Sequence, residues 1–200
     1  GLLGASAIPA FGPIRPGLRR TASGTGLVYD RRYLDHVLPE RAGEAHPESP
    51  LRLVRMMEVF AERGLDQAVL PLSLLDDSLS HVQYAHTAEH VDSVSTIDVS
   101  GRIAELAVSG ALGAVEAVAR GTVKNAFCAS RPPGHHANNT GAEEGFCFYS
   151  NGALSQQHIL RYRYKLGGAI RGTVTTTCCS THPPRWAGKG SEKWDGGWDR

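Results

Sequence analysis

A stripe of small and aliphatic residues between positions 102 and 120 restricts the possible folds more than any other feature of this sequence. Its members recur every third or fourth residue, as on one face of a helix: Ile103, Leu106, Ala107, Gly110, Ala111, Ala114, Val115 and Val118. Alanine and glycine have little side-chain bulk, so this helix can pack closely against a sheet. Residues 125–130 then form a short apolar run that predicts a buried strand. A helix of this kind followed by such a strand predicts an α/β fold.

Shorter patterns earlier in the chain extend the same prediction. The apolar runs at 27–29 and 69–72 are predicted strands. Between them, Ser49 as N-cap and Pro50 as the first helical residue predict the start of a helix. Residues 81–95 are predicted to form another helix. Strands and helices therefore alternate, as they do in folds with a parallel sheet.

Composition excludes several classes of protein. A formal net charge of +1, with 41% hydrophobic and 20% charged residues, is typical of a globular chain and not of a strongly basic nucleic-acid binder. No apolar run reaches the roughly 20 residues that span a bilayer. The four cysteines contain no C-x-x-C pair, so a structural zinc knuckle is not predicted. We expect neither direct nucleic-acid binding nor a membrane span.

Residues 1–24 are expected to lie outside the folded domain. Residues 1–12 are apolar and small and contain Ala5-Ser6-Ala7, which resembles the end of a bacterial export signal with its cleavage site. A flexible apolar leader accounts for the same residues, and a linker rich in proline and glycine follows. The first alternative predicts a periplasmic location, and the second leaves a cytoplasmic location open.

The loop after the predicted strand at 125–130 carries the residues that point to chemistry. It reads Arg131-Pro132-Pro133-Gly134-His135-His136-Ala137. The prolines stiffen the backbone, and the glycine permits a tight bend. Imidazoles exchange protons near neutral pH, and two adjacent ones are costly to bury without partners. Since α/β folds place their sites at the carboxyl ends of strands, His135 and His136 are candidate catalytic residues.

The motifs RPPGHHA at 131–137 and GFCFYSN at 145–151 together resemble the active-site loop of the zinc-dependent histone deacetylase family. The similarity is strongest to class II and bacterial acetylpolyamine amidohydrolase-like members. Three earlier segments agree in order: TGLVYD at 25–30, HPESP at 46–50 and the region from His81 to Val91. The resemblance covers about residues 24–151. It implies the N-terminal part of an arginase/deacetylase-like three-layer α/β/α domain with a parallel sheet, incomplete in this chain.

The resemblance also implies a function and roles for particular residues. Family members are zinc-dependent hydrolases that remove acetyl groups from acetyl-lysine or acetylpolyamines. His135 and His136 match the tandem histidines, of which one acts as base toward water and the other orients or protonates the leaving amine. Gly145 and Phe146 match the residues that line the narrow substrate tunnel, where an aromatic wall suits an aliphatic chain.

Three other residues of these motifs have structural interpretations. His46 and His86 are expected to make structural hydrogen bonds. Cys147 matches a small residue beside the acetyl pocket, and ordinary core packing accounts for it equally well.

The metal-binding half of the family site has no counterpart in the sequence. The family binds zinc through an Asp-x-His on the next strand and a later Asp, and a later Tyr polarises the substrate carbonyl. Catalytic zinc needs three protein ligands and an open position. No Asp-x-His occurs, and the only carboxylates after Asn151 are Glu192, Asp195 and Asp199. We therefore predict no metal ligands, no stably bound zinc and no deacetylase activity, and we do not expect the next strand. The alternative function is a non-catalytic acyl-lysine-binding or regulatory fragment.

The segment 152–200 differs from the rest in composition. It has eight lysines and arginines against three aspartates and glutamates. One interpretation is a disordered basic tail. The other is an out-of-frame tail, because the codons of residues 173–177, ACN GTN ACN ACN ACN, become NAC NGT NAC NAC NAC when read one base earlier. Since NAC encodes Asp, His, Asn or Tyr, that frame permits a metal-binding strand, and the nucleotide sequence of the gene tests it.

Overall fold

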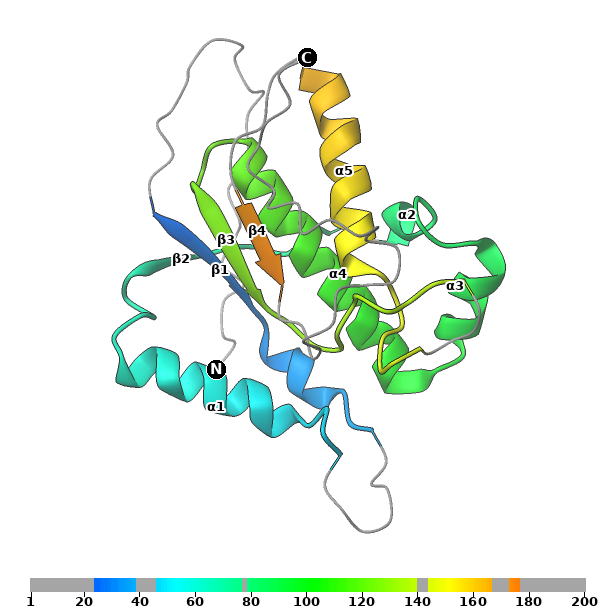
Figure 1. The fold of residues 1–200 in the computed structure, drawn as a ribbon, viewed down its shortest axis with the longest axis horizontal. Coiled ribbons are helices and arrows are strands. Elements are labelled where there is room, and N and C mark those ends of the chain that lie inside the picture. Colours follow the sequence, from blue (N-terminus) through cyan, green and yellow to red (C-terminus); the bar gives the residue numbers. More distant parts are fainter. Residues whose placement is uncertain (1–23, 39–45, 77–78, 140–143, 167–172, 177–200) are drawn as a thin grey trace, which may run out of the picture.

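A single parallel sheet organises the computed structural model, which describes residues 24–38, 46–76, 79–139, 144–166 and 173–176. Within these ranges the strands lie in the order β2 (Val69–Pro71), β1 (Thr25–Tyr29), β3 (Asn125–Ala129) and β4 (Thr173–Thr176). Each neighbouring pair is parallel. The strands therefore end at the same edge of the sheet, where the loop after β3 begins (Figure 1).

The centre of the sheet is the pair β1 and β3, in register from Thr25 and Asn125 to Tyr29 and Ala129. Both strands were predicted from their apolar runs, and that prediction is confirmed. Alternate residues face opposite sides of a strand. Cys128 packs in one apolar cluster with residues of α4 (Asp98–Ala119), while the Phe127 ring stacks on Phe60 of α1 (Pro50–Glu62) at a centroid distance of 5.9 Å. Helices thus lie on both faces, as expected for an α/β fold.

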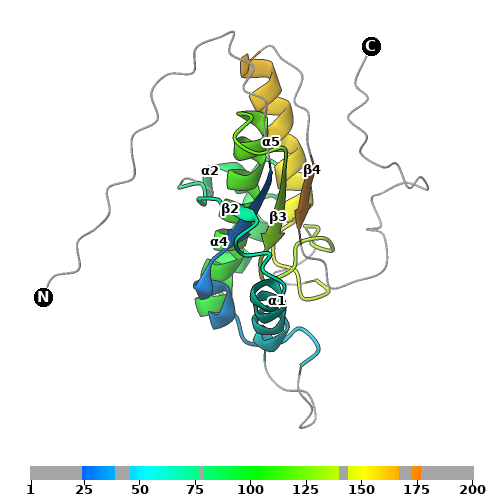
Figure 2. The ribbon, with the colours of Figure 1, turned by 90° about the vertical axis from the view of Figure 1, so that its left-hand side faces the viewer.

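The helix α4 is the predicted small-residue stripe, and it lies across one face of the sheet (Figures 1 and 2). The stripe residues Ala107, Ala111 and Ala114 are buried. Gly110 marks the closest approach, since a Cβ there would lie 2.8 Å from Cγ1 of Val28 and would also overlap the Tyr33 hydroxyl. The absence of side chains at such positions is what lets helix and sheet pack together.

Gly113 of α4 provides a test of this packing. Replacing a helical glycine by alanine normally stabilises a protein by about 0.5–1 kcal/mol, because alanine loses less backbone entropy on folding. At Gly113 the added Cβ would overlap the backbone carbonyl oxygen of Ser73. We therefore expect Gly113→Ala to lower the free energy of unfolding, by about 1–3 kcal/mol, as overpacking does.

The matched control is Gly152→Ala in α5 (Asn151–Leu166), where a Cβ would meet no atom of the described chain within 4 Å. This variant is expected to be slightly stabilising, by about 0.5 kcal/mol. Urea denaturation of both variants measures the difference. Equal effects at the two positions would contradict the close packing of α4 against the segment that holds Ser73.

The start of α1 is also confirmed. The Ser49 hydroxyl accepts the Leu51 N–H at 3.3 Å, and Pro50 is the first helical residue. The region predicted as one helix at 81–95 is instead two: α2 (Leu79–Val82) and α3 (Ala88–Ser95). The break follows from Thr87, whose hydroxyl caps α3 by accepting the His90 N–H at 3.3 Å.

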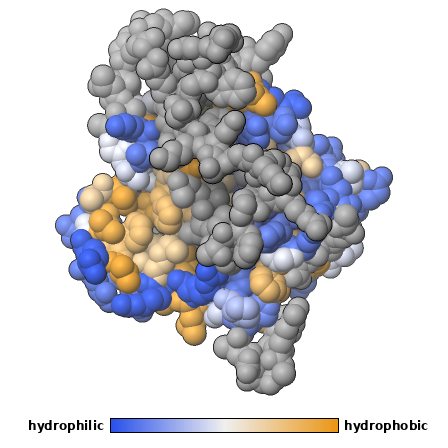
Figure 3. Space-filling view, viewed as in Figure 1, coloured by the Kyte–Doolittle hydropathy of each residue, from blue (hydrophilic) through white to orange (hydrophobic). Residues whose placement is uncertain are grey.

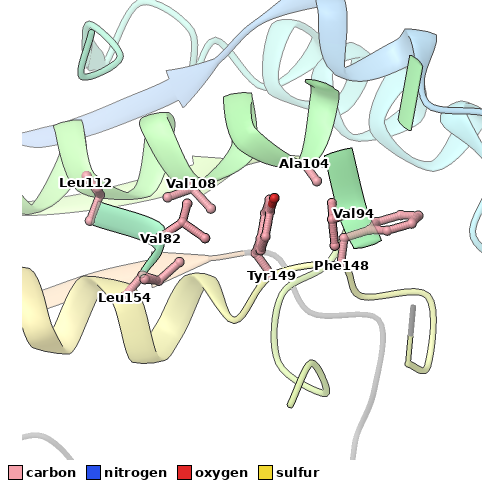
Figure 4. Packing of buried hydrophobic residues seen from close by; sticks show 8 residues of the cluster. All are labelled: Val82, Val94, Ala104, Val108, Leu112, Phe148, Tyr149 and Leu154. Atoms are coloured by element: carbon pink, nitrogen blue, oxygen red, sulfur yellow. The ribbon is translucent and has the colours of Figure 1, made fainter. Parts of the chain in front are cut away.

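The structure differs from the sequence-based prediction after residue 151. Residues 151–166 form α5, which packs on α4, and 173–176 form β4, which pairs with β3. Figure 4 shows Leu154 of α5 meeting Val82, Val108 and Leu112. Part of the segment predicted as a tail therefore belongs to the folded domain, and the expectation that no strand follows β3 in the sheet is wrong. Residues 1–23 and 177–200 lie outside the described residues.

Apolar surface gathers on one side of the molecule, over the part of the fold where β2 and α1 lie (Figures 1 and 3). Leu51 of α1 and Leu70 of β2 are both exposed.

Among the described residues, no helix is both long enough and apolar enough to cross a membrane.

Candidate active site

A buried ion pair fixes the start of the loop that follows β3. The Arg131 guanidinium donates from Nε to Glu48 at 2.9 Å and from Nη2 to the second carboxylate oxygen of Glu48 at 2.5 Å. Its other N–H groups reach the backbone carbonyls of Tyr33, His36 and Glu48 at 2.9–3.1 Å. Every part of the guanidinium is thus used, and the loop is held against the segments that follow β1 and precede α1.

His36 extends this network on its other side. Its Nε2 lies 3.4 Å from Oε2 of Glu48, and its Nδ1 lies 2.8 Å from the Ser100 hydroxyl. Burial by itself would raise the pKa of the Glu48 carboxyl, but hydrogen bonds from His36 and Arg131 outweigh it and lower that pKa to about 2. Glu48 is therefore ionised throughout the physiological pH range, and its charge balances that of Arg131.

The two adjacent histidines lie together beyond this anchor. The rings of His135 and His136 have centroids 4.2 Å apart and an interplanar angle of 50°. His135 is 8% exposed, and among the described residues its Nε2 has no hydrogen-bond partner. Burial, and then the neighbouring His136, lower the pKa of His135 below its ordinary value. At neutral pH His135 is therefore a neutral imidazole, the form that can accept a proton.

The sulfur of Cys147 joins this loop to the GFC motif. The backbone N–H groups of His135 and His136 each donate to Sγ at 3.4 Å, and Nδ1 of His135 lies 3.9 Å from it. The thiol in turn donates to the Gly145 carbonyl at 3.6 Å. Cys147 is fully buried, so both interpretations offered by the sequence, a site neighbour and a packed core residue, describe it.

The turn formed by Gly145 and Phe146 faces the histidines. Both residues have positive φ, 55° and 68°, and paired backbone hydrogen bonds of 2.9 Å between Glu144 and Cys147 close the turn. A Cβ on Gly145 would lie 2.8 Å from Cδ2 of His136, so glycine is needed there for space as well as for conformation. For phenylalanine a left-handed backbone costs about 1–2 kcal/mol, and strain of this kind clusters at ligand sites.

His46 and His86 make the structural hydrogen bonds that the sequence predicted. Nδ1 of His46 accepts the Glu48 N–H at 3.1 Å, and the ring meets Phe146 edge-on with centroids 4.6 Å apart. Nε2 of His86 accepts the Ser150 N–H at 2.9 Å. Both side chains therefore hold segments of the loop region in place.

The four site residues predicted from sequence come together at the carboxyl edge of the sheet. His136 and Gly145 are in contact distance, His135 lies beside His136, and Phe146 follows Gly145 in the same turn. Sequence reasoning missed the Arg131–Glu48 pair, although both residues stand in the quoted motifs. The two residues stand in different motifs, and neither motif by itself signals the pairing.

The described residues do not fit a zinc ion. In those parts of the chain no group of three or more histidine, cysteine, aspartate or glutamate side chains is arranged to hold a metal. Next to β3, the strand β4 has the sequence Thr-Val-Thr-Thr, which contains none of the residue types that bind zinc in proteins. The buried Nε2 of His135 is a nitrogen donor with one neighbouring imidazole, that of His136, but the described part of the chain supplies no third ligand beside them.

Most of the described chain, including these motifs, matches a known protein family. Residues 46–167 match the family model described as the histone deacetylase domain. Histone deacetylase 5 of Arabidopsis thaliana is 31% identical over 164 residues, which are 71% of this chain and 24% of that protein. Polyamine deacetylase HDAC10 of Homo sapiens is 31% identical over 156 residues, covering 68% of this chain and 23% of that protein. The chain thus spans about a quarter of these curated relatives.

A solved structure matches the fold as well. The crystal structure of the HDA15 HD domain aligns with a TM-score of 0.66 and 31% sequence identity, over 71% of this chain and 44% of that one. The fold is therefore of the arginase/deacetylase-like α/β type that the sequence motifs implied, and the chain corresponds to less than half of that solved domain.

Proposed function

Because this chain belongs to the histone deacetylase family, we propose that His135 and His136 are the proton-transfer residues of an amide-hydrolysing site. One observation carries the proposal: a buried, neutral imidazole with an unpartnered Nε2, as far as the described residues go, lies beside a second, partly exposed one. The second of them, His136, stands opposite a strained Gly145–Phe146 turn. This is the arrangement that general acid–base chemistry requires.

These positions suit the two proton transfers that amide hydrolysis requires. Hydrolysis of an acetamide adds water to the carbonyl carbon, breaks the C–N bond and returns a proton to the departing amine. A neutral imidazole accepts the proton that water loses, and the histidine pair returns a proton to the departing amine. We propose acetyl-lysine or an acetylpolyamine as substrate, because Phe146 offers an apolar wall for an aliphatic stem and one relative is named a polyamine deacetylase.

We propose further that the 200-residue chain does not carry out this reaction by itself. Family members depend on zinc, and the described residues lack a ligand set for it. Without a Lewis acid, hydrolysis of an unactivated amide has little to stabilise the oxyanion that forms. In the described ranges, the proposed proton-transfer residues therefore stand without a ligand set for the metal that would polarise the carbonyl.

An acetyl-lysine peptide and an N-acetylpolyamine, each with added Zn²⁺, test this. We expect no turnover above that of His135→Ala measured side by side, with an active deacetylase as positive control. Turnover that His135→Ala abolishes would refute the inactivity and support catalysis by the same histidine.

The second candidate is a non-catalytic acyl-lysine-binding fragment. It is favoured by the Gly145–Phe146 turn, whose closing hydrogen bonds and contact with His46 need no metal ligand. Fluorescence anisotropy with acetylated and unacetylated forms of one labelled peptide distinguishes the candidates. Binding that requires the acetyl group and is lost in Phe146→Ala would support this function, and equal binding of both peptides would oppose it.

A further inference from the structure

A second pair of histidines lies behind the proposed catalytic pair. His86 and His90 stack with ring centroids 4.5 Å apart and an interplanar angle of 17°, and both are buried. His86 lies just before α3, and His90 lies in its first turn. Neither residue belongs to the proposed proton-transfer pair, so their burial needs another explanation.

The hydrogen bonds of His86 determine which nitrogen carries its proton. Nε2 accepts the Ser150 N–H at 2.9 Å, so it must be unprotonated. The proton is therefore on Nδ1, which donates to Oδ1 of Asn139 at 3.1 Å. The same oxygen accepts the Thr87 N–H at 3.1 Å. His86 thus connects Asn139, just after the first site motif, to Ser150, near the end of the second.

His90 adds a third connection. Its Nε2 lies 2.7 Å from the carbonyl oxygen of Phe148, which only accepts, so this nitrogen carries the proton. The Tyr149 ring contacts both imidazoles, with centroids 5.5 Å from His86 and 5.9 Å from His90. The backbone on each side of Tyr149 is therefore held by one histidine.

We infer that His86, His90 and Asn139, together called the histidine clamp, are positioning residues for the catalytic loop. Residues 131–139 carry His135 and His136, and residues 144–150 carry the Gly145–Phe146 turn. The first stretch is anchored at Arg131 by Glu48 and at Asn139 by His86. The second is anchored at its end by His86 and His90.

The two stretches also meet at Cys147, through hydrogen bonds weaker than those of the clamp. Sulfur accepts hydrogen bonds weakly, and the bonds to Cys147 are 3.4 Å long. His86 is the side chain that bonds both stretches through nitrogen and oxygen atoms. This inference rests on the proposed function for its meaning, but the geometry that it concerns is independent of turnover.

Asn139→Ala is the variant that tests the clamp, because Asn139 is exposed and its truncation leaves no buried cavity. In the full chain, without substrate, hydrogen exchange of the Ser150 amide is compared with that of Val108 in α4. We expect hydrogen exchange at Ser150 to become about tenfold faster while exchange at Val108 is unchanged. The reason is that the variant makes local opening around Ser150 easier but leaves the free energy of global unfolding the same. By NMR, the pKa of His135 should rise toward its ordinary value as burial lessens.

Two further variants complete the test. Asn139→Asp keeps an acceptor oxygen for the His86 and Thr87 N–H groups and should restore Ser150 protection. Ser95→Ala removes an exposed hydrogen bond at the other end of α3 and should change nothing at the site. Unchanged Ser150 exchange and unchanged His135 titration in Asn139→Ala would overturn the inference. Equal acceleration at Ser150 and Val108, or failure of aspartate to restore protection, would overturn it as well. Since no readout uses substrate, failure here is separate from failure of the deacetylase proposal.

Discussion

Glu48→Gln is expected to lower the free energy of unfolding by about 3–5 kcal/mol, the usual cost of leaving one partner of a buried ion pair uncompensated. Arg131 is 4% exposed, and its guanidinium donates two of its hydrogen bonds to the Glu48 carboxylate. A neutral amide supplies one acceptor oxygen in place of two and leaves the cation buried. Urea denaturation monitored by circular dichroism measures the loss.

Two comparisons make this expectation specific. Glu62 pairs with Arg55 at 2.9 Å on the exposed face of α1, and Glu62→Gln is expected to leave stability essentially unchanged. The double variant Glu48→Gln with Arg131→Met removes both charges and should lose less than the sum of the single variants. A loss for Glu48→Gln no larger than that for Glu62→Gln would mean that the buried pair does not hold the loop.

Acid is expected to destabilise the protein in two stages. Burial, and then the electrostatic influence of the neighbouring His90, lower the pKa of His86 from 6.5 to about 4, so the unfolded chain binds more protons than the folded one between these values. The pKa of Glu48 is lowered from 4.5 to about 2, so the same holds there. Both groups contribute stability that is present at neutral pH and lost as the pH falls. Each loss is on the order of 2 kcal/mol after allowance for solvent screening.

The first stage of acid destabilisation, protonation of His86, has a structural cause that the variant His86→Gln tests. Protonated His86 has no lone pair left on Nε2 for the Ser150 N–H, so the clamp opens as that nitrogen gains its proton. Urea denaturation between pH 7 and 4 measures the dependence in the natural chain and in His86→Gln. The glutamine variant has no titrating group at this position and should show a flatter profile. A natural chain whose stability is constant from pH 7 to 4 would contradict the assignment.

Local patterns in the sequence predicted the parts of the fold that local chemistry determines. The stripe of α4 and the capping residue of α1 are such patterns, and both are confirmed. The motif around His135 and the one around Phe146 were predicted to share a site, and the structure brings the two motifs into contact. In each case the determining residues are neighbours along the chain or lie on one helical face.

The features that sequence reasoning missed depend on distant residues or on weak patterns. Arg131 and Glu48 are 83 positions apart, and no local rule relates them. The helix α5 is polar over much of its surface, and it is stabilised by packing on α4 rather than by a strong apolar stripe. The β-branched residues of β4 favour a strand, a signal independent of the codon interpretation of residues 173–177.

The pairing of β1 with β3 has a consequence for how the chain acquires its structure. Thr25 is paired with Asn125, so the innermost ladder of the sheet closes a loop of about a hundred residues. The entropy cost of closing such a loop comes before the stabilising contacts form, and chains dominated by long-range pairing fold slowly. During synthesis this ladder must wait until β3 has left the ribosome. β1 can pair with β2 as soon as Pro71 is available, but its second edge stays open until β3 is made. The twin imidazoles that follow β3 therefore reach their places only after this long-range pairing.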